Sequence, residues 1–317
     1  MKPTVLILGA RGRFGLAAAR AFSEADWNVL GQIRPGASAC LAGVQWLPLD
    51  LADGAALAQA ARGASVVVHA LNPPYPQWGK QLPVLMEAAM GLAETLDATL
   101  MFPGNVYNYG ASMLALLDEA TPQRPSTRKG ALRVAMEQRL IDSGVRSVVI
   151  RAGDYFGSGS GSWFDIALAK DIHKGKMTYP GAMDVATSWA YLPDLARSFV
   201  AVANRLTQDP AALPRHASFG FAGHQLRGSD WAALMQAVAQ GRGWLAPGQR
   251  LKLGRMPWWL IHSLSFAVPI FRELSEMRYL WQTPYALSGD RLAAFIGVQP
   301  VTPLPQALRA ALADLGK

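Results

Sequence analysis

The sequence has one cysteine, Cys40, and only 16% of its 317 residues are charged. A single cysteine excludes a disulfide framework and a cysteine-based metal site, and it favours a reducing cytoplasm. The low charge and the 51% hydrophobic content predict a large packed core. The sequence also lacks a His-Glu-x-x-His pattern, a phosphate-loop lysine and a serine elbow. Metal-dependent hydrolysis, phosphoryl transfer and acyl transfer are therefore unsupported, and no metal site is expected.

Long hydrophobic runs are also missing. The apolar run after Lys2 ends at Gly9, too soon for a signal peptide. The one membrane-like stretch, residues 256–271, contains Pro257, His262 and Pro269 and is shorter than the roughly 20 residues that span a bilayer. We expect a buried helix over a substrate cleft here and no stable membrane insertion. Contact with a membrane interface and a homodimer surface are the alternatives.

The formal net charge is +8. Such a balance can indicate nucleic-acid binding. The cations are scattered, however, without a lysine/arginine block or a recognition motif, so we expect no nucleic-acid partner. A basic enzyme with anionic small-molecule ligands fits the composition.

The most informative feature lies in the first fifteen residues. An apolar run, Thr4–Leu8, predicts a buried parallel strand, and an alanine-rich helical pattern follows from Leu16 to Ala25. Three glycines stand between them. In such a turn the first glycine permits the tight bend, the second lets a pyrophosphate approach, and the third lets helix and strand pack closely. The pyrophosphate would lie on free N–H groups at the helix start. The predicted dinucleotide contacts are Gly9, Arg11, Gly12, Arg13, Phe14 and Gly15.

Further strand-like runs alternate with helical patterns. They are Val29–Ile33, Val44–Pro48, Val66–His69, Thr99–Phe102 and Ser147–Arg151. This alternation predicts an α/β fold with a doubly wound parallel Rossmann sheet and a smaller C-terminal substrate domain. We expect the nucleotide-binding domain over residues 1–157, with a returning segment near 177–222. Residues 158–317 would mainly form the substrate domain, with helices over 163–173, from Asp194 as the cap, and after Thr302.

The sequence resembles the short-chain dehydrogenase/reductase superfamily, in its extended or atypical epimerase/dehydratase-like branch. The resemblance rests on the Gly-x-x-Gly-x-x-Gly spacing, on Leu49-Asp50-Leu51 and on the segments 104–107, 151–157 and 189–196. The resemblance implies that Asp50 and Leu51 flank the adenine. It also implies that Ala70, Leu71 and Asn72 line the ribose and pyrophosphate. Asn105 falls near the position of the family's serine and is counted with the cofactor contacts.

The end of the second predicted strand selects the cofactor. An acid there would hold the ribose 2′-hydroxyl of NAD, whereas an arginine accommodates the 2′-phosphate of NADP. The strand ends Gln32-Ile33-Arg34, without an acid, and Arg11 is a second cation. A guanidinium suits phosphate oxygens. The sequence therefore predicts NADP, with NAD as the less favoured cofactor and a solvated Arg34 as the alternative.

The catalytic pair of the resembled family, Tyr-x-x-x-Lys, is missing from this chain. Aligned through Glu137, the two positions hold Lys129 and Arg133. The like charge of Arg133 could make Lys129 a proton donor. Arg133 could hold ribose hydroxyls or a substrate acid, and Tyr107 could supply a phenol instead. The alternative is that Lys129 and Arg133 are solvated helix cations.

Aromatic and polar residues after the later strands are the substrate-side candidates, because α/β sites form at the C-terminal strand ends. Core packing is the alternative for Trp189 and Tyr191, and His69 is expected to be buried and satisfied. The candidates are Tyr75, Trp78, Asp154, Tyr155, Trp189 and Tyr191.

Two functions stay open at this point. The first is an NADP(H)-dependent oxidoreductase or epimerase/dehydratase-like enzyme acting at an oxygen-bearing carbon of a small polar or sugar-like substrate. The second is a nucleotide-binding sensor without turnover. The altered catalytic pair favours the sensor, whereas the aromatic C-terminal region favours the enzyme.

Overall fold

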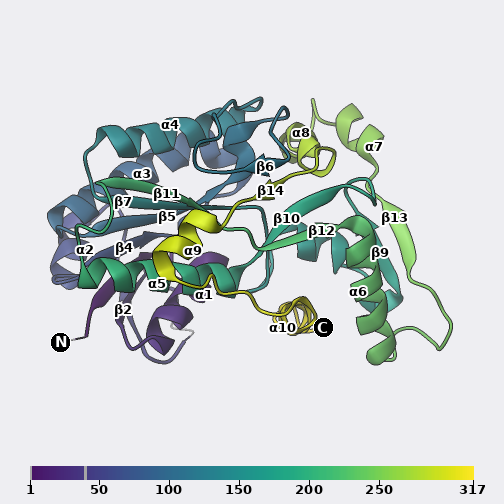
Figure 1. The fold of residues 1–317 in the computed structure, drawn as a ribbon, viewed down its shortest axis with the longest axis horizontal. Coiled ribbons are helices and arrows are strands. Elements are labelled where there is room, and N and C mark those ends of the chain that lie inside the picture. Colours follow the sequence, from purple (N-terminus) through teal and green to yellow (C-terminus); the bar gives the residue numbers. More distant parts are fainter. Residues whose placement is uncertain (1, 39–40) are drawn as a thin grey trace.

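The computed structural model describes residues 2–38 and 41–317, so Cys40 lies outside the described residues. A seven-stranded parallel sheet forms its centre, in the order β11-β7-β5-β4-β1-β2-β3 (Figure 1). All six strands predicted from the sequence are present, and β11 is a seventh. The doubly wound α/β prediction is confirmed. The strands are β1 (Thr4–Leu8), β2 (Asn28–Ile33), β3 (Val44–Pro48), β4 (Val66–His69), β5 (Thr99–Asn105), β7 (Ser147–Ala152) and β11 (His216–Gly220).

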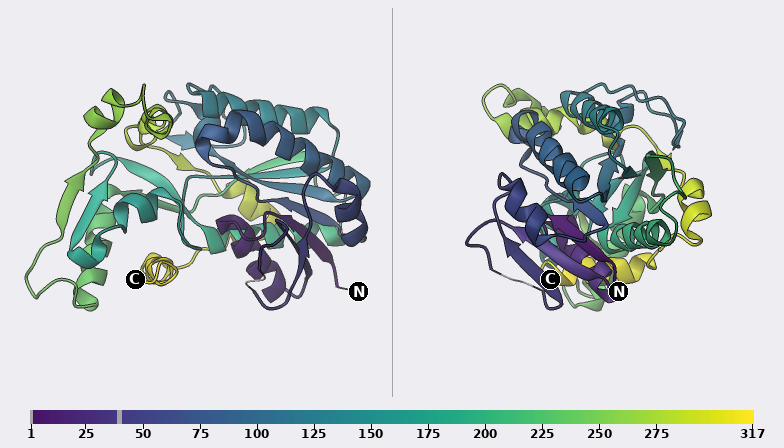
Figure 2. Two further views of the ribbon diagram at one scale, coloured as in Figure 1. Left: turned by 180° about the vertical axis from the view of Figure 1, so that it is seen from behind. Right: turned by 90° about the vertical axis from the view of Figure 1, so that its left-hand side faces the viewer.

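Helices cover both faces of this sheet (Figures 1 and 2). One face carries α2 (Gly54–Ala60), α3 (Trp78–Thr95) and α4 (Arg128–Asp142), and the other carries α1 (Arg13–Glu24), α5 (Leu192–Gln208) and α9 (Asp290–Ile296). Alternate residues of β1 enter the two cores: Leu6 and Leu8 pack under the first set, and Val5 and Ile7 under the second. A strand buried on both faces reads as a continuous apolar run, which explains the sequence pattern.

The C-terminal part of the chain forms a smaller lobe at one end of the sheet (Figure 1). Its core contains Phe156, Trp189 and Trp231, and the rings of Phe156 and Trp189 each meet that of Trp231 edge to face. Between residues 192 and 220 the chain returns to the central sheet, where β11 pairs with β7. The remaining strands are β6 (Leu116–Leu117), β8 (Asp154–Phe156), β9 (Lys176–Tyr179), β10 (Ala186–Tyr191), β12 (His224–Arg227), β13 (Lys252–Arg255) and β14 (Ala286–Leu287). The remaining helices are α6 (Gly228–Gly241), α7 (Trp258–Ser263), α8 (Pro269–Glu276), α10 (Leu304–Ala313) and the short η1 (Tyr75–Gln77), η2 (Val106–Tyr109), η3 (Phe164–Leu168), η4 (Ile172–Lys174) and η5 (Arg278–Trp281).

The helix predicted over residues 163–173 is wrong. The structure has only the π turn η3 and the 3-10 turn η4 there. The Asp165 carboxylate accepts hydrogen bonds from the backbone N–H groups of Gly161 and Ser162 at 2.7 and 2.6 Å. These bonds draw the preceding glycine-serine loop around Asp165, and a regular α-helix does not continue from it.

The predicted capping role of Asp194 is also wrong. Tyr191 occupies the N-cap of α5, and Asp194 lies inside the first turn. The Asp194 carboxylate accepts from the backbone N–H and the hydroxyl of Thr302 at 2.7 and 2.6 Å, and it pairs with Arg197. The helix predicted after Thr302 is present as α10, but it begins at Leu304 with Pro303 at its N-cap, and Thr302 bonds to Asp194 instead. Asp194 therefore connects α5 to the segment before α10 and does not cap a helix.

The segment over residues 256–271 differs most from its prediction. It forms α7, a turn and the start of α8 in place of one buried helix, because Pro269 opens a new helix at its N-terminus. Ile261 is buried, but Trp259 is 74% exposed and Phe266 is 89% exposed. Across the described residues, no helix is both long and apolar enough to cross a membrane.

Candidate functional site

The three glycines of the turn meet three different demands of the backbone. Gly9 has φ +74°, a left-handed conformation that favours glycine. A Cβ on Gly15 would lie 2.3 Å from the Gly9 carbonyl oxygen, so the third glycine is needed for close packing. Gly12 is exposed, and a Cβ there would lie 3.2 Å from the same oxygen. Because none of the described side chains caps α1 at Gly12, the first N–H groups of the helix are available to an anion.

The cations of the turn lie in different places. Arg11 is exposed beside the turn. Arg13 is half-buried and donates to the carbonyl oxygen of Gly157 at 2.8 Å, and burial lowers the pKa of its guanidinium. Phe14 packs edge to face on Phe199 at 4.8 Å, which directs it into the core under α5. Arg13 therefore ties the glycine turn to the loop after β8.

The end of β2 carries a contact that the sequence analysis missed. Gln32 is buried, its side-chain oxygen accepts from the Gly9 N–H at 3.0 Å, and its amide donates to the Leu49 carbonyl at 2.9 Å. The Gln32 side chain thus connects the glycine turn to the end of β3. A polar residue inside an otherwise apolar strand was the available signal. Arg34 follows on the exposed side of the strand end.

The loops after β3, β4 and β5 carry the other predicted cofactor contacts. Asp50 is exposed and accepts from the N–H of Ala52 at 2.9 Å, and Leu51 is half-buried beside it. After β4, Ala70 and Leu71 are half-buried and Asn72 is exposed. Leu71 also lies 2.8 Å from the position of a Cβ on Gly9, so this loop closes over the glycine turn.

His69 and Asn105 end their strands with local hydrogen bonds. Asn105 accepts from the Tyr107 N–H at 3.0 Å and caps η2. His69 Nδ1 accepts from the Leu71 N–H at 3.3 Å, and Nε2 has no partner among the described residues. Burial, with the nearby Arg133 charge, lowers the pKa of His69 to about 3, so the imidazole is neutral. The prediction that His69 is buried is confirmed, although only one nitrogen is satisfied.

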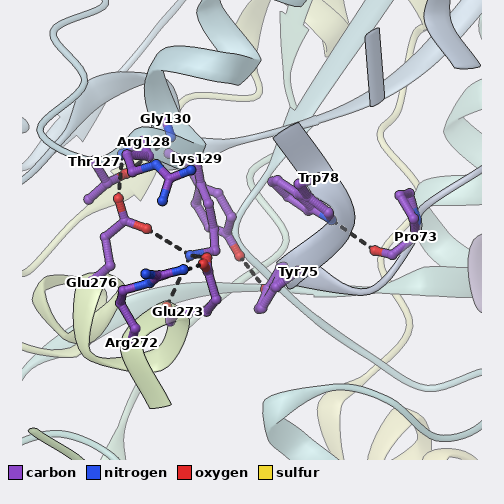
Figure 3. A network of polar contacts seen from close by, with 11 residues as sticks. Pro73, Tyr75, Trp78, Thr127, Arg128, Lys129, Gly130, Arg272, Glu273 and Glu276 are labelled. Carbon is purple, nitrogen blue, oxygen red and sulfur yellow. Dashed lines mark hydrogen bonds and ion pairs between the residues drawn. The ribbon is translucent and has the colours of Figure 1, made fainter. Parts of the chain in front are cut away.

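Lys129 and Arg133 are both buried, which contradicts the alternative that they are solvated helix cations. The Thr127 hydroxyl accepts from the Gly130 N–H at 3.0 Å and fixes the start of α4. Lys129 Nζ pairs with the carboxylates of Glu273 and Glu276, the latter at 2.8 Å, and donates to the Glu273 carbonyl at 3.1 Å. Figure 3 shows both carboxylates reaching Lys129 from α8.

Arg133 has a different environment, one turn further along α4. Its guanidinium carbon lies 4.6 Å from the Trp78 ring centre and 5.1 Å from that of Phe102, in the middle of β5. Nε and Nη1 are buried and have no hydrogen-bond partner in the described chain. Burial lowers the pKa of this guanidinium. The next acid on the helix, Glu137, pairs with Arg151 instead. Arg133 is thus a buried cation with unused donors.

Two tyrosine hydroxyls meet beside these cations. The hydroxyl oxygens of Tyr75 and Tyr107 lie 3.0 Å apart, and Lys129 Nζ lies 5.2 Å from the centre of the Tyr75 ring. Burial raises the pKa of both phenols, so both are protonated at neutral pH. Trp78 packs edge to face on Tyr75 and anchors its indole N–H on the Pro73 carbonyl at 2.9 Å (Figure 3).

Asp154 lies next to this pair at the end of the smaller lobe. The Trp281 indole donates to its carboxylate at 3.0 Å, and burial raises the pKa of Asp154 to about 7. Tyr285, from the same C-terminal segment, carries a buried hydroxyl with no partner within the described residues. The neighbouring Tyr155 donates to the Gly104 carbonyl at 2.6 Å. The sequence analysis missed Trp281 and Tyr285 because no local pattern links them to Asp154.

Trp189 lies inside the smaller lobe. Its side chain is fully buried, packs on Trp231 at 5.0 Å and donates its indole N–H to Thr187 at 3.0 Å. The residue packs in the core of the smaller lobe, in agreement with the core-packing alternative. Tyr191 packs on Phe156 at 5.2 Å, in agreement with the core-packing alternative.

Comparison with models of known protein families identifies the family of this chain. The model of the "NAD dependent epimerase/dehydratase family" matches residues 5–213. The chain belongs to this family. A sequence comparison with curated proteins finds no match. The family membership confirms the resemblance seen in the sequence.

Solved structures share the fold of this epimerase/dehydratase-family protein over almost its whole length. A Burkholderia cenocepacia protein described as a candidate epimerase is 20% identical, with a TM-score of 0.75 and 99% of both chains covered. Bordetella bronchiseptica WbmH, solved with NAD+, is 18% identical, with a TM-score of 0.72 and coverage of 99% of this chain and 98% of that one. UDP-glucose 4-epimerase from Brucella ovis, solved with NAD, is 14% identical, with a TM-score of 0.73 and the same coverage.

The residues of this family member fit a dinucleotide. Gly12 leaves the start of α1 open, while Gly9 and Gly15 hold the turn in shape. Arg133 offers two buried donors that no described residue uses. Together these features supply an anion site at one end and unsatisfied donors at the other.

Proposed function

We propose that the chain is an NADP(H)-dependent oxidoreductase or epimerase/dehydratase-like enzyme. It would act at an oxygen-bearing carbon of a small polar or sugar-like substrate. The observation that carries the proposal is the buried Arg133 guanidinium, whose Nε and Nη1 lack partners among the described residues. A buried cation without hydrogen bonds is costly unless a ligand satisfies it. The sugar-nucleotide epimerases among the structural neighbours support a sugar-like substrate.

In this proposal the cofactor contacts run from the glycine turn to α4. The start of α1 and Arg13 hold the pyrophosphate, and Arg34 meets the 2′-phosphate. Asp50, Leu51 and the loop of residues 70–72 enclose the adenine and ribose side. Arg133 donates to the ribose hydroxyls beside the nicotinamide, with Asn105 at the neighbouring strand end. When bound, the dinucleotide supplies or accepts a hydride.

The proton step is assigned to the hydroxyl pair. Tyr107 donates a proton to the substrate oxygen. The hydroxyl of Tyr75, 3.0 Å away, then donates a hydrogen bond to the oxygen of Tyr107. Burial raises the pKa of Tyr107, so its hydroxyl stays protonated and is available as the proton donor. Asp154 holds a substrate hydroxyl beside Trp78 and Tyr155. A proton-donor role for Lys129 remains a prediction. Its ammonium is paired with two carboxylates of α8, which gives it a structural role as well.

We expect NADPH to bind more tightly than NADH. Arg34 is exposed at the end of β2, where it can reach a 2′-phosphate, and no acid stands there to hold a free ribose hydroxyl. Arg34→Asp should weaken NADPH binding by about 2 kcal/mol through lost charged hydrogen bonds and new repulsion. Paired fluorescence titrations measure both affinities, with Arg62→Asp as a charge-matched control. Equal or reversed affinities in the parent protein would remove the NADP assignment.

We expect Tyr107→Phe to lower turnover about 100-fold, the scale of general acid catalysis, and to leave NADPH affinity unchanged. Tyr109→Phe is the control on the same short helix, since its hydroxyl donates to the Asp118 carbonyl instead. The assay screens aldehydes, ketones and nucleotide sugars for NADPH consumption. A fully active Tyr107→Phe protein would exclude the hydroxyl pair from the proton step.

The alternative function is a dinucleotide-binding sensor without turnover. The replacement of Tyr-x-x-x-Lys by Lys129 and Arg133 favours it. The sensor binds NADPH but consumes none with any substrate of the screen. NADPH binding without consumption across the whole screen would therefore favour the sensor over the enzyme.

A further inference from the structure

An apolar tip projects from the smaller lobe where α7 turns into α8 (Figure 1). A patch of this kind on an exposed turn usually marks an interaction surface. Trp259 and Phe266 are 74% and 89% exposed, far more than large aromatic side chains in a packed core. The tip consists of Trp259, Leu260, Leu264, Phe266 and Ile270, all exposed.

The border of the tip is cationic. The exposed cations of residues 250–280 are Arg250, Lys252, Arg255, Arg272 and Arg278. The region from 250 to 280 contains only two acids, Glu273 and Glu276, and both are paired with Lys129 on the inner side of α8. Glu273 also lies 3.9 Å from Arg272 Nε, so Arg272 is partly balanced, whereas Arg255 and Arg278 are exposed without an acid of residues 250–280 beside them.

A hollow of about 490 Å³ lies between α7, α8 and the start of α4. Arg278 and His262 line it, together with Ser126 and Thr127. Ser275, also on its wall, carries a buried hydroxyl with no partner among the described residues. Glu276 lines the hollow too, with its charge balanced by Lys129. A cation and a free hydroxyl beside an apolar tip can receive an anionic headgroup.

We propose that the apolar tip docks the protein peripherally on an anionic lipid surface. Trp259 and Phe266 enter the interface, while the bordering arginines contact the headgroups. Aromatic side chains flanked by cations are the composition that favours the interface of an anionic bilayer. A second copy of the chain is the less favoured occupant, because a symmetric contact would bring the cationic borders together without an opposing acid.

The test is co-sedimentation of the full chain with phosphatidylcholine vesicles, with and without phosphatidylglycerol. We expect binding to the anionic vesicles only, and weaker binding as salt rises, because the headgroup contacts are screened. Trp259→Ser/Phe266→Ser should lower the partition coefficient about tenfold or more. Val298→Ser/Val301→Ser is the matched control, since both valines are exposed elsewhere, at 88% and 51%. Thermal melts confirm that both variants are folded.

Three results would overturn the proposal. The first is no binding to either vesicle, and the second is equal binding to both. The third is binding that the tip variant retains. Analytical ultracentrifugation tests the competing occupant: a dimer that Trp259→Ser/Phe266→Ser dissociates, without vesicle binding by the parent, would assign the tip to a second copy. The tip lies outside the proposed cofactor contacts, so the tip variant should bind NADPH as the parent does. Failure of the membrane proposal would therefore leave the proposed function untouched.

Discussion

Gly12→Val is expected to fold and to lose dinucleotide binding, whereas Gly15→Ala is expected to lose the fold. At Gly12 an added Cβ would lie 3.2 Å from the Gly9 carbonyl oxygen, a contact that a small shift relieves. Gly12 also has φ −65°, which any residue adopts. The valine branches would then occupy the exposed space at the start of α1 that the pyrophosphate needs.

Gly15→Ala meets a different obstacle. The Cβ would lie 2.3 Å from the Gly9 carbonyl oxygen and 2.9 Å from the Ala10 Cα, so the backbone of β1 or α1 would have to move. Circular dichroism melts and NADPH titrations separate the two effects. Gly91→Ala, in open space on α3, is the control and should melt no lower than the parent. A folded Gly12→Val protein that still binds NADPH would show that the turn is only structural.

Lys129→Met is expected to lower the free energy of unfolding by about 3–5 kcal/mol. The side chains of Lys129, Glu273 and Glu276 are 3%, 11% and 21% exposed, so removal of the ammonium leaves two poorly hydrated carboxylates without the cation that they share. Chemical denaturation measures the loss. A loss of unfolding free energy below about 1 kcal/mol, as for an exposed ion pair, would show that the three charges are well hydrated in solution.

The triple variant Lys129→Met/Glu273→Gln/Glu276→Gln decides between positioning and catalysis. Neutral amides remove the repulsion, so most of the stability should return. If Lys129 only fixes α8 against α4, turnover should return with stability. If Lys129 is the proton donor, turnover should remain lost in the stable triple variant. We expect the first result, because the ammonium is already bonded to α8.

The sequence predicted those features that depend on short segments. β1, the glycine turn and α1 follow from one apolar run and three spaced glycines, and all of them are present, although α1 begins at Arg13 and not at Leu16. The burial of His69 was also predictable, because it continues an apolar strand. These features need only local periodicity and steric rules.

Features that join distant segments were not predictable in the same way. Asp194 matches a helix cap locally, yet Thr302 competes successfully for its carboxylate. The residues over 256–271 are apolar enough for a core, but Pro269 divides them and leaves Trp259 exposed. Trp281 reaches Asp154 across 127 positions of sequence, a pairing that no spacing rule encodes. Tertiary contacts therefore override local preference at these sites.

The link between Lys129 and α8 also has a consequence for the order of folding. Lys129 bonds to residues that follow it by 144 and 147 positions. Contacts over such separations form late, because the intervening chain must close first. On a growing chain, α4 would emerge long before its carboxylates, so Lys129 would stay hydrated and the first turn of α4 would remain unpacked. The sheet can therefore assemble first, and the closure of this corner would be delayed until synthesis has passed Glu276.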